Sequence, residues 1–391
     1  MLSASPHVVQ ISFFVDPQQR EPEQLLRDWP TLVEVAEAAH GAGVRVSVVQ
    51  ACSLARSLMR NGVDYHFFAA EPTAATPARS TGVDTLIRSL DPDVLHVHGL
   101  GFFADVAVLA KLLPGVPILL QDHASRLPRP WRRRAWRRGL SLVSGVAFCA
   151  TEQSTPFAKA GLFADHTRIY EIPESSSRFT PGDQALARQS TGLAGNPCLL
   201  WVGHLNANKD PLTVLDGVSE AAGTLPEIQL WCCFGTAPLH AAVTRRIARD
   251  PRLRCRVHLL GSRPHEQIEQ FMRAADFLVS GSHREGSGYA LIEALACGLP
   301  PVVTDIPSFR TLTGGGAVGR LWPCGEAQRL CASLLSIASQ PRAALRAAVR
   351  THFDCELSVQ ALGRQLADTY RQLHDHRPAR AAAVSGAGTR C

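Results

Sequence analysis

The alternation of short apolar runs with longer amphipathic segments is the feature that most constrains the fold of this chain. Apolar runs of strand length recur in two series, and amphipathic segments such as LVEVAEAAHGAG and HEQIEQFMRAAD lie between them. Strands that alternate with helices are typical of parallel sheets built from βαβ units. We therefore expect an α/β protein with ten strands, at residues 7–15, 44–50, 93–99, 117–123, 145–150, 197–204, 228–235, 256–261, 276–283 and 300–305.

The two series of strands indicate two doubly wound domains. A length of 391 residues also favours two domains over one. The join is expected near residues 170–184, which are rich in proline, serine and charge, as linkers are. The prediction is a first domain at 1–175, a second at 176–350, a helical segment at 351–376 with one long helix over 353–373, and a disordered tail at 377–391.

Composition argues against several classes of protein. The hydrophobic share of 46% supplies sizeable cores, and a net charge of +6 gives no reason to expect a nucleic-acid partner. No apolar run reaches the roughly 18 residues that a membrane span needs. The first residues, MLSASPHVVQISFFVDP, favour a strand over a signal peptide. Eleven scattered cysteines without a CxxC pair are typical of reduced thiols, so we expect a cytoplasmic protein.

Polar, small or glycine residues stand where most of the expected strands end. In parallel sheets, ligands bind outside the carboxyl ends of the strands. These residues therefore predict a site drawn from both domains, in a cleft between them. The strand-end residues are His98-Gly99, Asp122-His123, Gly203-His204, Phe234-Gly235, 283–288 and Thr304-Asp305.

The segment EGSGYALIEALACG, residues 285–298, carries the strongest signal of a binding site. Its glycines allow a ligand to approach the backbone closely, and the helix that follows offers free N–H groups and a positive dipole end to a phosphate. An ionised Glu293 can accept hydrogen bonds from a sugar diol. The alternative is that Glu293 is an exposed helix position and Glu285 a solvated loop charge.

The same segment resembles the Glu-x7-Glu segment of retaining GT-B glycosyltransferases, in particular glycosyltransferase family four. Glu285 and Glu293 have the required spacing, and GLPPVVTDIPSFR continues the match. The resemblance implies that Glu285 contacts the donor hexose and that Glu293 binds the nucleotide ribose. It also implies that the amides of Ser287, Gly288 and Tyr289 face the diphosphate and the sugar.

A second match lies in LWVGHLNANKDPLTVLDGV, residues 200–218. It resembles the family's segment of strand, Gly-Arg, loop, Lys and helix, whose Arg and Lys neutralise the donor diphosphate. Lys209 falls on the Lys, and His204, after Gly203, stands where the family has Arg. A neutral imidazole offers a phosphate less than a guanidinium does, so we expect weaker or pH-dependent diphosphate binding. The alternative for Lys209 is a solvated surface lysine.

The first half of the chain resembles the family more loosely. PILLQDHASR resembles the strand whose terminal histidine lies near the donor sugar and the acceptor, which makes His123 the candidate to contact the hexose or to steady the transition state. DVLHVHGLG places His98 and Gly99 near the acceptor. Either histidine could instead be structural. The family's Gly-Gly turn after the first strand is absent from DPQQREPEQ, so contacts at that loop are not expected.

The resemblance covers most of residues 7–373 and implies a particular enzyme. It implies two Rossmann-like domains facing a central cleft, with the donor held by the second domain, the acceptor by the first, and the helix at 353–373 returning to the first. The implied reaction moves a hexosyl unit from a nucleotide-diphosphate sugar to a sugar or lipid-linked acceptor, with retention and without a metal or cofactor. The rivals are a hydrolysing nucleotide-sugar epimerase and a non-catalytic protein that binds sugar nucleotides or lipids.

Two short motifs suggest metal sites that the surrounding sequence does not favour. Asp91-Pro92-Asp93 has the DxD pattern of metal-dependent glycosyltransferases, but it precedes its strand and is typical of a turn. His96 and His98 would lie on one side of a strand, as a zinc pair does, yet no HxxE or CxxC partner is present. We therefore predict no metal site, and zinc hydrolysis remains a minor alternative.

The segment RLPRPWRRRAWRRGL, residues 126–140, has seven arginines and two tryptophans. On a helix, Trp131, Ala135 and Arg138 would line one side, which could bind an anionic membrane surface or an anionic lipid-linked acceptor. In that case the protein would be peripheral to the membrane. The alternative is a solvated basic helix that packs its tryptophans inward.

Overall fold

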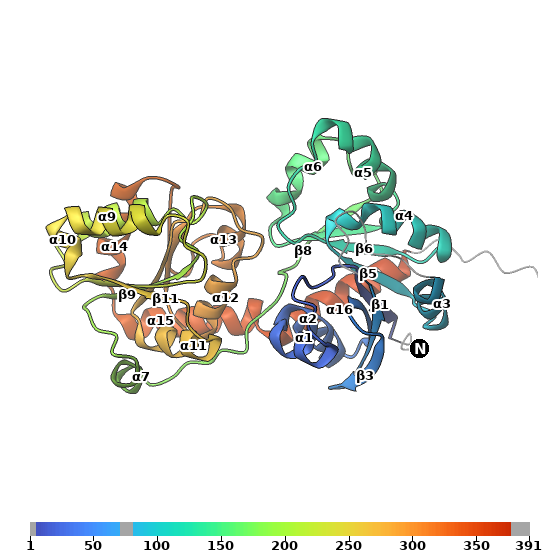
Figure 1. Ribbon diagram of the computed structural model, residues 1–391, viewed down its shortest axis with the longest axis horizontal. Coiled ribbons are helices and arrows are strands. Elements are labelled where there is room, and N and C mark those ends of the chain that lie inside the picture. Colours follow the sequence, from blue (N-terminus) through green and yellow to red (C-terminus); the bar gives the residue numbers. More distant parts are fainter. Residues whose placement is uncertain (1–4, 71–80, 377–391) are drawn as a thin grey trace, which may run out of the picture. The chain divides into compact units, whose positions relative to one another are not determined.

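A computed structural model describes residues 5–70 and 81–376 (Figure 1). The chain divides into two compact units. The first unit takes in the chain up to Phe148, then Ser154–Tyr170, and the chain from Gly363 onward. The second unit comprises Cys149–Gln153 and Glu171–Leu362. The tail predicted at 377–391 lies outside the described residues.

The first unit is built on an eight-stranded sheet in the order β3-β4-β2-β1-β5-β6-β7-β8. β4, β2, β1, β5, β6 and β7 run parallel, and β3 pairs antiparallel with β4. The order reverses between β1 and β5, as in a doubly wound fold. The strands are β1 His7–Ser12, β2 Arg45–Cys52, β3 Arg56–Arg60, β4 Val63–Ala69, β5 Val94–His98, β6 Ile118–Gln121, β7 Gly145–Phe148 and β8 Arg168–Glu171.

Helices cover this sheet and include the last helix of the chain. Strand residues such as Val9, Leu95 and Leu120 are fully buried beneath them. Gly363 allows the last helix to pack closely on the second, since an added Cβ would lie 2.3 Å from the Ala38 carbonyl oxygen. The helices are α1 Pro22–Asp28, α2 Pro30–Gly41, α3 Thr81–Ser89, α4 Phe103–Leu112, α5 Arg133–Leu140, α6 Thr155–Lys159 and α16 Val359–Asp375, with 3-10 turns η1 Leu100–Phe102, η2 Pro130–Arg132 and η3 Thr151–Ser154.

The second unit has a six-stranded parallel sheet in the order β11-β10-β9-β12-β13-β14. In chain order this is 3-2-1-4-5-6, the order of a dinucleotide-binding fold, with the reversal between β9 and β12. These two neighbouring strands send their connections in opposite directions. The strands are β9 Cys198–Gly203, β10 Gln229–Phe234, β11 Val257–Gly261, β12 Phe277–Ser280, β13 Pro301–Thr304 and β14 Arg320–Trp322.

Two hydrophobic cores lie on the two faces of the second sheet, because successive strand residues point to opposite sides. Leu199 belongs to the core under α8, α9 and α14, and Leu200 to the core under α11, α12 and α13. The helices are α7 Gln184–Thr191, α8 Pro211–Ala221, α9 His240–Arg249, α10 Pro251–Arg254, α11 His265–Ala274, α12 Tyr289–Ala296, α13 Pro307–Leu312, α14 Ala327–Ala338 and α15 Arg342–His352, followed by a π-helical turn, η4 Phe353–Leu357.

The prediction of an α/β fold with two doubly wound sheets is confirmed, but its details are incomplete. The structure adds β3, β4, β8 and β14 to the ten expected strands. β3 and β4 form a hairpin through Asn61-Gly62, where both residues have positive φ, as the favoured two-residue hairpin turn requires. An Asn-Gly pair between two strand-like runs indicates a hairpin, so β3 and β4 could have been predicted from the sequence.

The prediction of one long helix over 353–373 is wrong. The chain forms η4, breaks at Ser358, and begins α16 at Val359. Ser358 is extended, with φ −60° and ψ 161°, and its hydroxyl accepts a hydrogen bond from the amide of Ala361. A serine in this conformation caps a new helix, which is why the two helical segments do not fuse.

Candidate functional site

The loops that follow β9 and β12 bring together the charged residues predicted to bind a donor. Since these strands are neighbours at the reversal of strand order, their carboxyl ends open onto the same edge of the sheet. Lys209 Nζ and Glu285 Oε1 form an ion pair there, with side chains 22% and 13% exposed. Glu285 is therefore a partly buried, paired carboxylate, and the alternative of a solvated loop charge is wrong.

The start of α12 has a backbone conformation that only glycine adopts easily. Gly288 caps the helix with φ 88° and ψ 66°, and an added Cβ would lie 2.6 Å from the Phe309 ring. Ser287 is buried, and its hydroxyl accepts a hydrogen bond from the amide of Glu174 at 2.9 Å. The Tyr289 hydroxyl donates to Glu174 Oε2 at 3.1 Å. Side-chain contacts with the 171–177 segment thus fix the loop on both sides of the glycine.

Gln153, which the sequence did not single out, holds the loop from one side. Its side-chain amide donates to the carbonyl oxygens of Glu285 and Gly286, at 2.8 and 2.9 Å. Its carbonyl oxygen accepts from the amide of Ala150, which fixes the rotamer. In a trans peptide the carbonyl and the next N–H point in opposite directions. The amides of Gly286 and Ser287 therefore point away from Gln153, and neither donates a hydrogen bond within the described residues.

His204 is exposed at the end of β9 and is oriented by one backbone contact. Its Nδ1 accepts a hydrogen bond from the amide of Thr236 at 3.2 Å. A neutral imidazole that accepts at Nδ1 carries its hydrogen on Nε2. His204 therefore presents an N–H donor beside the Lys209 loop. A second histidine of this region, His283, pairs with Asp210 Oδ2 at 3.0 Å.

Glu293 lies within α12 and is paired with a histidine that the sequence did not single out. His265 Nε2 is 2.6 Å from Glu293 Oε1, and its ring packs against Phe179 with centroids 4.6 Å apart. The Glu293 side chain is 17% exposed, so the alternative of an exposed helix position is wrong. His265 begins α11, 28 residues before Glu293 in the sequence, and nothing in its local sequence predicts this pairing.

In the first unit the predicted histidines lie together at the carboxyl ends of β5 and β6. His98 Nδ1 is 3.2 Å from His123 Nε2, and the rings of His96 and His98 lie side by side with centroids 4.4 Å apart. Gly99, with φ 103°, turns the chain directly after His98. The structure thus brings His98, Gly99 and His123 together, as the sequence predicted for this edge of the sheet.

Burial sets the charge of two of these histidines. His96 is fully buried, and its Nδ1 contacts the hydroxyl of Tyr370 on α16 at 2.8 Å. Desolvation, with a smaller contribution from His123, lowers the pKa of His96 to about 3. Desolvation, together with His96 and His123, also lowers the pKa of His98 well below 6.5. Both rings are therefore neutral near pH 7.

The two suspected metal motifs do not assemble a ligand set. Asp91 has φ 43°, and Asp93 Oδ2 accepts from the amide of His7, so the Asp-Pro-Asp turn lies at the amino end of β5, as predicted. His96 and His98 share one side of β5, also as predicted. Within residues 5–70 and 81–376, no group of three or more His, Cys, Asp or Glu side chains is arranged to hold a metal ion.

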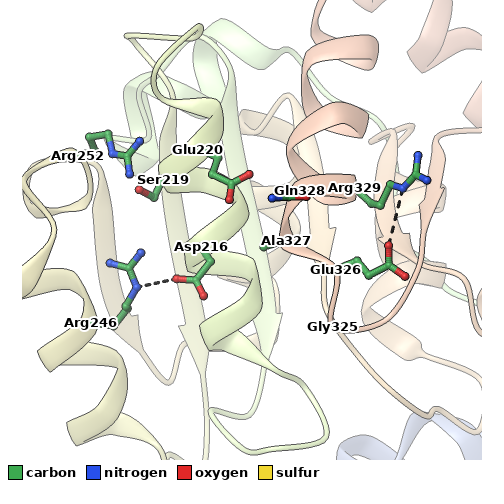
Figure 2. Close-up of a pocket in the computed structure, with 10 residues that line it drawn as sticks. All are labelled: Asp216, Ser219, Glu220, Arg246, Arg252, Gly325, Glu326, Ala327, Gln328 and Arg329. Atoms are coloured by element: carbon green, nitrogen blue, oxygen red, sulfur yellow. Dashed lines mark hydrogen bonds and ion pairs between the residues drawn. The ribbon is translucent and has the colours of Figure 1, made fainter.

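A hollow of about 470 Å³ lies elsewhere in the second unit, between α8, α9 and the start of α14 (Figure 2). Two of its arginines already pair with carboxylates that line it, Arg246 with Asp216 and Arg329 with Glu326. None of the predicted site residues, all of which lie in the described part of the chain, lines this hollow. Its mixed and internally paired charges give it no evident ligand.

Solved structures define the class to which this fold belongs. Sucrose-phosphate synthase from Thermosynechococcus elongatus matches with a TM-score of 0.68 at 18% identity, over 95% of this chain and 99% of that one. Anabaena Alr3699/HepE, solved in complex with UDP, matches with a TM-score of 0.67 at 18% identity, over 94% and 100%. The fold is that of the GT-B glycosyltransferases, as predicted.

Family models match both halves of the chain. The model described as Glycosyltransferase Family 4 matches residues 31–155, and the model described as Glycosyl transferases group 1 matches residues 183–351. The chain therefore belongs to glycosyltransferase family 4, within the group 1 glycosyl transferases. This confirms the family that the Glu285–Glu293 segment resembles.

Curated relatives are glycosyltransferases with different acceptors. The GDP-mannose:cellobiosyl-diphosphopolyprenol alpha-mannosyltransferase of Xanthomonas campestris is 28% identical over 66% of this chain and 67% of that protein. The D-inositol 3-phosphate glycosyltransferase of Nocardia farcinica is 31% identical over 40% and 37%. The 2-deoxystreptamine N-acetyl-D-glucosaminyltransferase of Streptomyces fradiae is 26% identical over 84% and 78%. The chain thus spans from about a third to about three quarters of the length of these relatives.

Among the described residues, no helix combines the length and apolarity that crossing a membrane requires.

Proposed function

We propose that this protein transfers a hexosyl unit from a nucleotide-diphosphate sugar to an acceptor, with retention of anomeric configuration and without a metal ion. The observation that carries the proposal is the Lys209–Glu285 pair at the reversal of strand order, beside the glycine-capped start of α12. A cation, a carboxylate and outward-facing backbone amides are the groups that a sugar diphosphate needs for recognition.

The donor diphosphate would lie between Lys209, the Nε2 hydrogen of His204 and the amides of residues 287–289. These groups provide positive potential through one charge, one oriented imidazole and the dipole of α12. Glu285, held at the edge of the phosphate region by Lys209, would accept hydrogen bonds from the hexose hydroxyls. The ion pair would thus link the phosphate subsite, at Lys209, to the sugar subsite, at Glu285, before the donor binds.

The nucleotide ribose would bind Glu293. His265 occupies Oε1 of this carboxylate, so the second oxygen is the one that a ribose hydroxyl would reach. The contact with His265 fixes the carboxylate in one rotamer, which lowers the entropy cost of recognising a diol. Gly203, at the end of β9, lets the chain turn directly into the phosphate loop.

His123 is proposed to contact the hexose, with His98 and Gly99 on the acceptor side. His98 is neutral, and its hydrogen bond with His123 fixes the orientation of the His123 ring. An imidazole held in one orientation can hydrogen-bond to a sugar hydroxyl and can stabilise charge that develops on the sugar ring.

In the proposed reaction the bond between the anomeric carbon and the diphosphate oxygen breaks, and the acceptor oxygen bonds to the anomeric carbon on the same face. The hydroxyl proton of the acceptor passes to the departing phosphate oxygen. Lys209, His204 and the α12 amides would stabilise the charge that develops on the leaving group. Glu285 would hold the hexose while positive charge builds on its ring.

The acceptor is proposed to be a sugar, free or lipid-linked. The names of the Xanthomonas and Nocardia relatives specify a lipid diphosphate-linked sugar and an inositol phosphate. A thermal-shift screen with UDP-, GDP- and ADP-sugars would identify the donor base, since a bound donor raises stability by mass action. The donor so identified then serves in every assay below.

Calorimetry tests the donor site. Lys209→Ala and Glu293→Ala should each weaken donor binding by at least about tenfold, because each removes a charged hydrogen-bonding partner. Lys111→Ala and Glu220→Ala, at exposed positions on α4 and α8, are matched controls that should bind as the parent does. Parental affinity in both test variants would refute the donor site.

Two measurements separate the proposal from its rivals. Turnover of the donor with water as the only acceptor, at the rate seen with sugar acceptors, would identify a hydrolysing epimerase. Tight donor binding without turnover in the presence of a panel of sugar and lipid-linked acceptors would identify a non-catalytic binding protein. Acceptor-dependent release of the nucleotide diphosphate, with the product in the donor's anomeric configuration, is the result that we expect.

A further inference from the structure

The basic segment at residues 126–140 forms a surface that the proposed reaction does not use. It contains seven arginines and no aspartate or glutamate. In the structure it comprises a loop, the turn η2 and the helix α5, all within the first unit. Its function is therefore a question separate from the donor site.

Close packing on α4 fixes the orientation of α5. The ring of Trp136 packs against Phe103 in a tilted arrangement, with centroids 5.3 Å apart, and only 8% of Trp136 is exposed. At Gly139 an added Cβ would lie 1.9 Å from the Phe103 carbonyl oxygen, so the two backbones are in contact. Arg137 donates to the carbonyl oxygens of Ala160 and Gly161 and braces the helix from its side. The opposite side of the helix is consequently held toward solvent.

The exposed side has apolar residues at its ends and arginines between them. Trp131 is 72% exposed, and Leu142, just after the helix, is 44% exposed. Between them Arg134, Ala135 and Arg138 are exposed at helical spacing. The expectation that the tryptophans pack inward is thus correct for Trp136 and wrong for Trp131.

The arginines of this surface carry uncompensated charge. None of the seven forms an ion pair within residues 5–70 and 81–376. Arg129 lies over the Trp131 ring at 5.3 Å, which leaves its guanidinium edges open to further hydrogen bonds. Apart from Arg137, which donates to backbone carbonyls, five of these arginines are exposed and have no carboxylate partner among the described residues: Arg126, Arg129, Arg132, Arg134 and Arg138. Five exposed positive charges on one short segment that also exposes an indole attract an anionic surface.

We propose that this face, residues 126–142, docks on an anionic phospholipid surface. The arginines would bind lipid phosphates, and Trp131 and Leu142 would enter the headgroup region, where an indole with a polar edge and an apolar body is favoured. A lipid surface fits better than a nucleic acid because this face exposes the indole of Trp131 and the aliphatic Leu142, not a row of aromatic rings on which bases could stack. The proposal does not rest on the identity of the donor or the acceptor.

Vesicle co-sedimentation of the full chain tests this surface. We expect binding to phosphatidylcholine vesicles that contain phosphatidylglycerol, little binding to phosphatidylcholine alone, and loss of binding as salt rises. Arg134→Glu/Arg138→Glu should lower the partition coefficient by at least about tenfold, since each substitution replaces an attraction with a repulsion. Trp131→Ala should lower it by several-fold and should reduce the part of binding that survives high salt.

A matched control reverses the same charge at another exposed helix. Arg245→Glu/Arg249→Glu on α9 changes the net charge equally, at positions that are exposed in the second unit. This variant should bind vesicles within about twofold of the parent if the α5 surface is the docking face. Equal losses in the two double variants would overturn the proposal, because only net charge would then matter.

Two further readouts keep the outcomes apart. Thermal unfolding and donor-induced stabilisation of each variant should match the parent, which separates a lost surface from a lost fold and from failure of the donor site. A single-stranded oligonucleotide that displaces the protein from anionic vesicles at stoichiometric concentration would overturn the lipid assignment in favour of nucleic acid. Parental vesicle binding by Arg134→Glu/Arg138→Glu would also overturn it.

Discussion

The loops after β9 and β12 and the ends of β5 and β6 both gather polar side chains, but they control charge in opposite ways. In the second unit Lys209 and Glu285 form an ion pair, which sets two opposite charges side by side. In the first unit His96 and His98 are neutral near pH 7 because burial lowers the pKa of both. One unit keeps charges in place by pairing them, and the other removes charge by desolvation.

This difference matches two different chemical tasks. A departing diphosphate needs positive potential that is already in position, which a paired lysine and a helix terminus supply. A sugar hydroxyl needs an oriented donor or acceptor, which a neutral imidazole supplies without binding a phosphate in the wrong place. If this contrast is right, removing a charge should impair transfer most in the second unit, and removing a buried imidazole should change the pH dependence of stability in the first.

The largest effect is expected at Lys209. Lys209→Met keeps the apolar stem and removes the charge, so it should lower kcat/KM for transfer by about 100- to 1,000-fold, as losing one electrostatic contact to a transition state does. Steady-state transfer kinetics measure this, with Lys111→Met as the control for loss of a lysine. A change of less than about threefold in kcat/KM would contradict the proposed contrast between the two units, since transfer would then not depend on the charge of Lys209.

A smaller effect is expected at Gln153, which acts through the loop and not on the donor. Gln153→Leu removes both hydrogen bonds to the carbonyls of Glu285 and Gly286, so the amides of the loop lose their fixed direction. The donor KM should rise by about tenfold. Gln153→Glu should be at least as damaging, because an ionised carboxylate cannot donate and would face two carbonyl oxygens.

Gln184 provides the matched control for Gln153. Its side-chain amide also donates to two successive carbonyls, those of Ala274 and Ala275, but at the amino end of β12. Gln184→Leu should lower the melting temperature about as much as Gln153→Leu and leave the donor KM unchanged. If both variants raised the donor KM alike, Gln153 would be only a structural residue.

Part of this arrangement was predictable, for identifiable physical reasons. Periodicity predicts the strands that end before Lys209 and Glu285, and the resemblance to the family predicts that both residues belong to one donor site. The reversal of strand order that brings their loops together is seen only in the structure. The contact of Gln153 with the loop does not follow, because 132 residues separate it from Glu285 and its neighbours carry no pattern. His265 is missed for the same reason. Contacts of this kind depend on side chains that meet only after two distant segments pack.

An intermediate effect on stability is expected from His96. The unfolded state binds a proton on this ring below about pH 6.5, but the folded state does not until about pH 3. The free energy of unfolding should therefore fall as pH falls between these values, by about 1.4 kcal/mol per pH unit for this group. Urea unfolding at several pH values measures the slope.

His96→Gln should lower the slope of unfolding free energy against pH by about 1.4 kcal/mol per pH unit, because the group that titrates is gone. It should also lower stability at pH 7, because the contact with Tyr370 is altered. His66→Gln is a control at a half-buried histidine of β4, where desolvation lowers the pKa to a lesser extent. An unchanged slope in His96→Gln would show that burial does not set the charge of the first unit's histidines. The proposed contrast with the charged pair of the second unit would then fail.

The smallest effect is expected at Tyr289, which links the donor loop to Glu174. Tyr289→Phe removes the hydrogen bond to Glu174 Oε2 but leaves the backbone that the donor is proposed to contact. Since Tyr289 is 40% exposed, water can replace the lost partner, and the cost in unfolding free energy should be about 1 kcal/mol. Tyr170→Phe is the control, because that buried hydroxyl has no partner among the described residues and its removal should be neutral or slightly stabilising. Thermal unfolding of both variants and the donor KM of Tyr289→Phe measure these effects.

A loss of stability in Tyr289→Phe with a donor KM within about twofold of the parent would mean that the tyrosine hydrogen bond holds the loop in place while the loop amides bind the donor. A donor KM raised as far as in Gln153→Leu would instead place the tyrosine hydroxyl, and not only the backbone, among the groups that order the charged site.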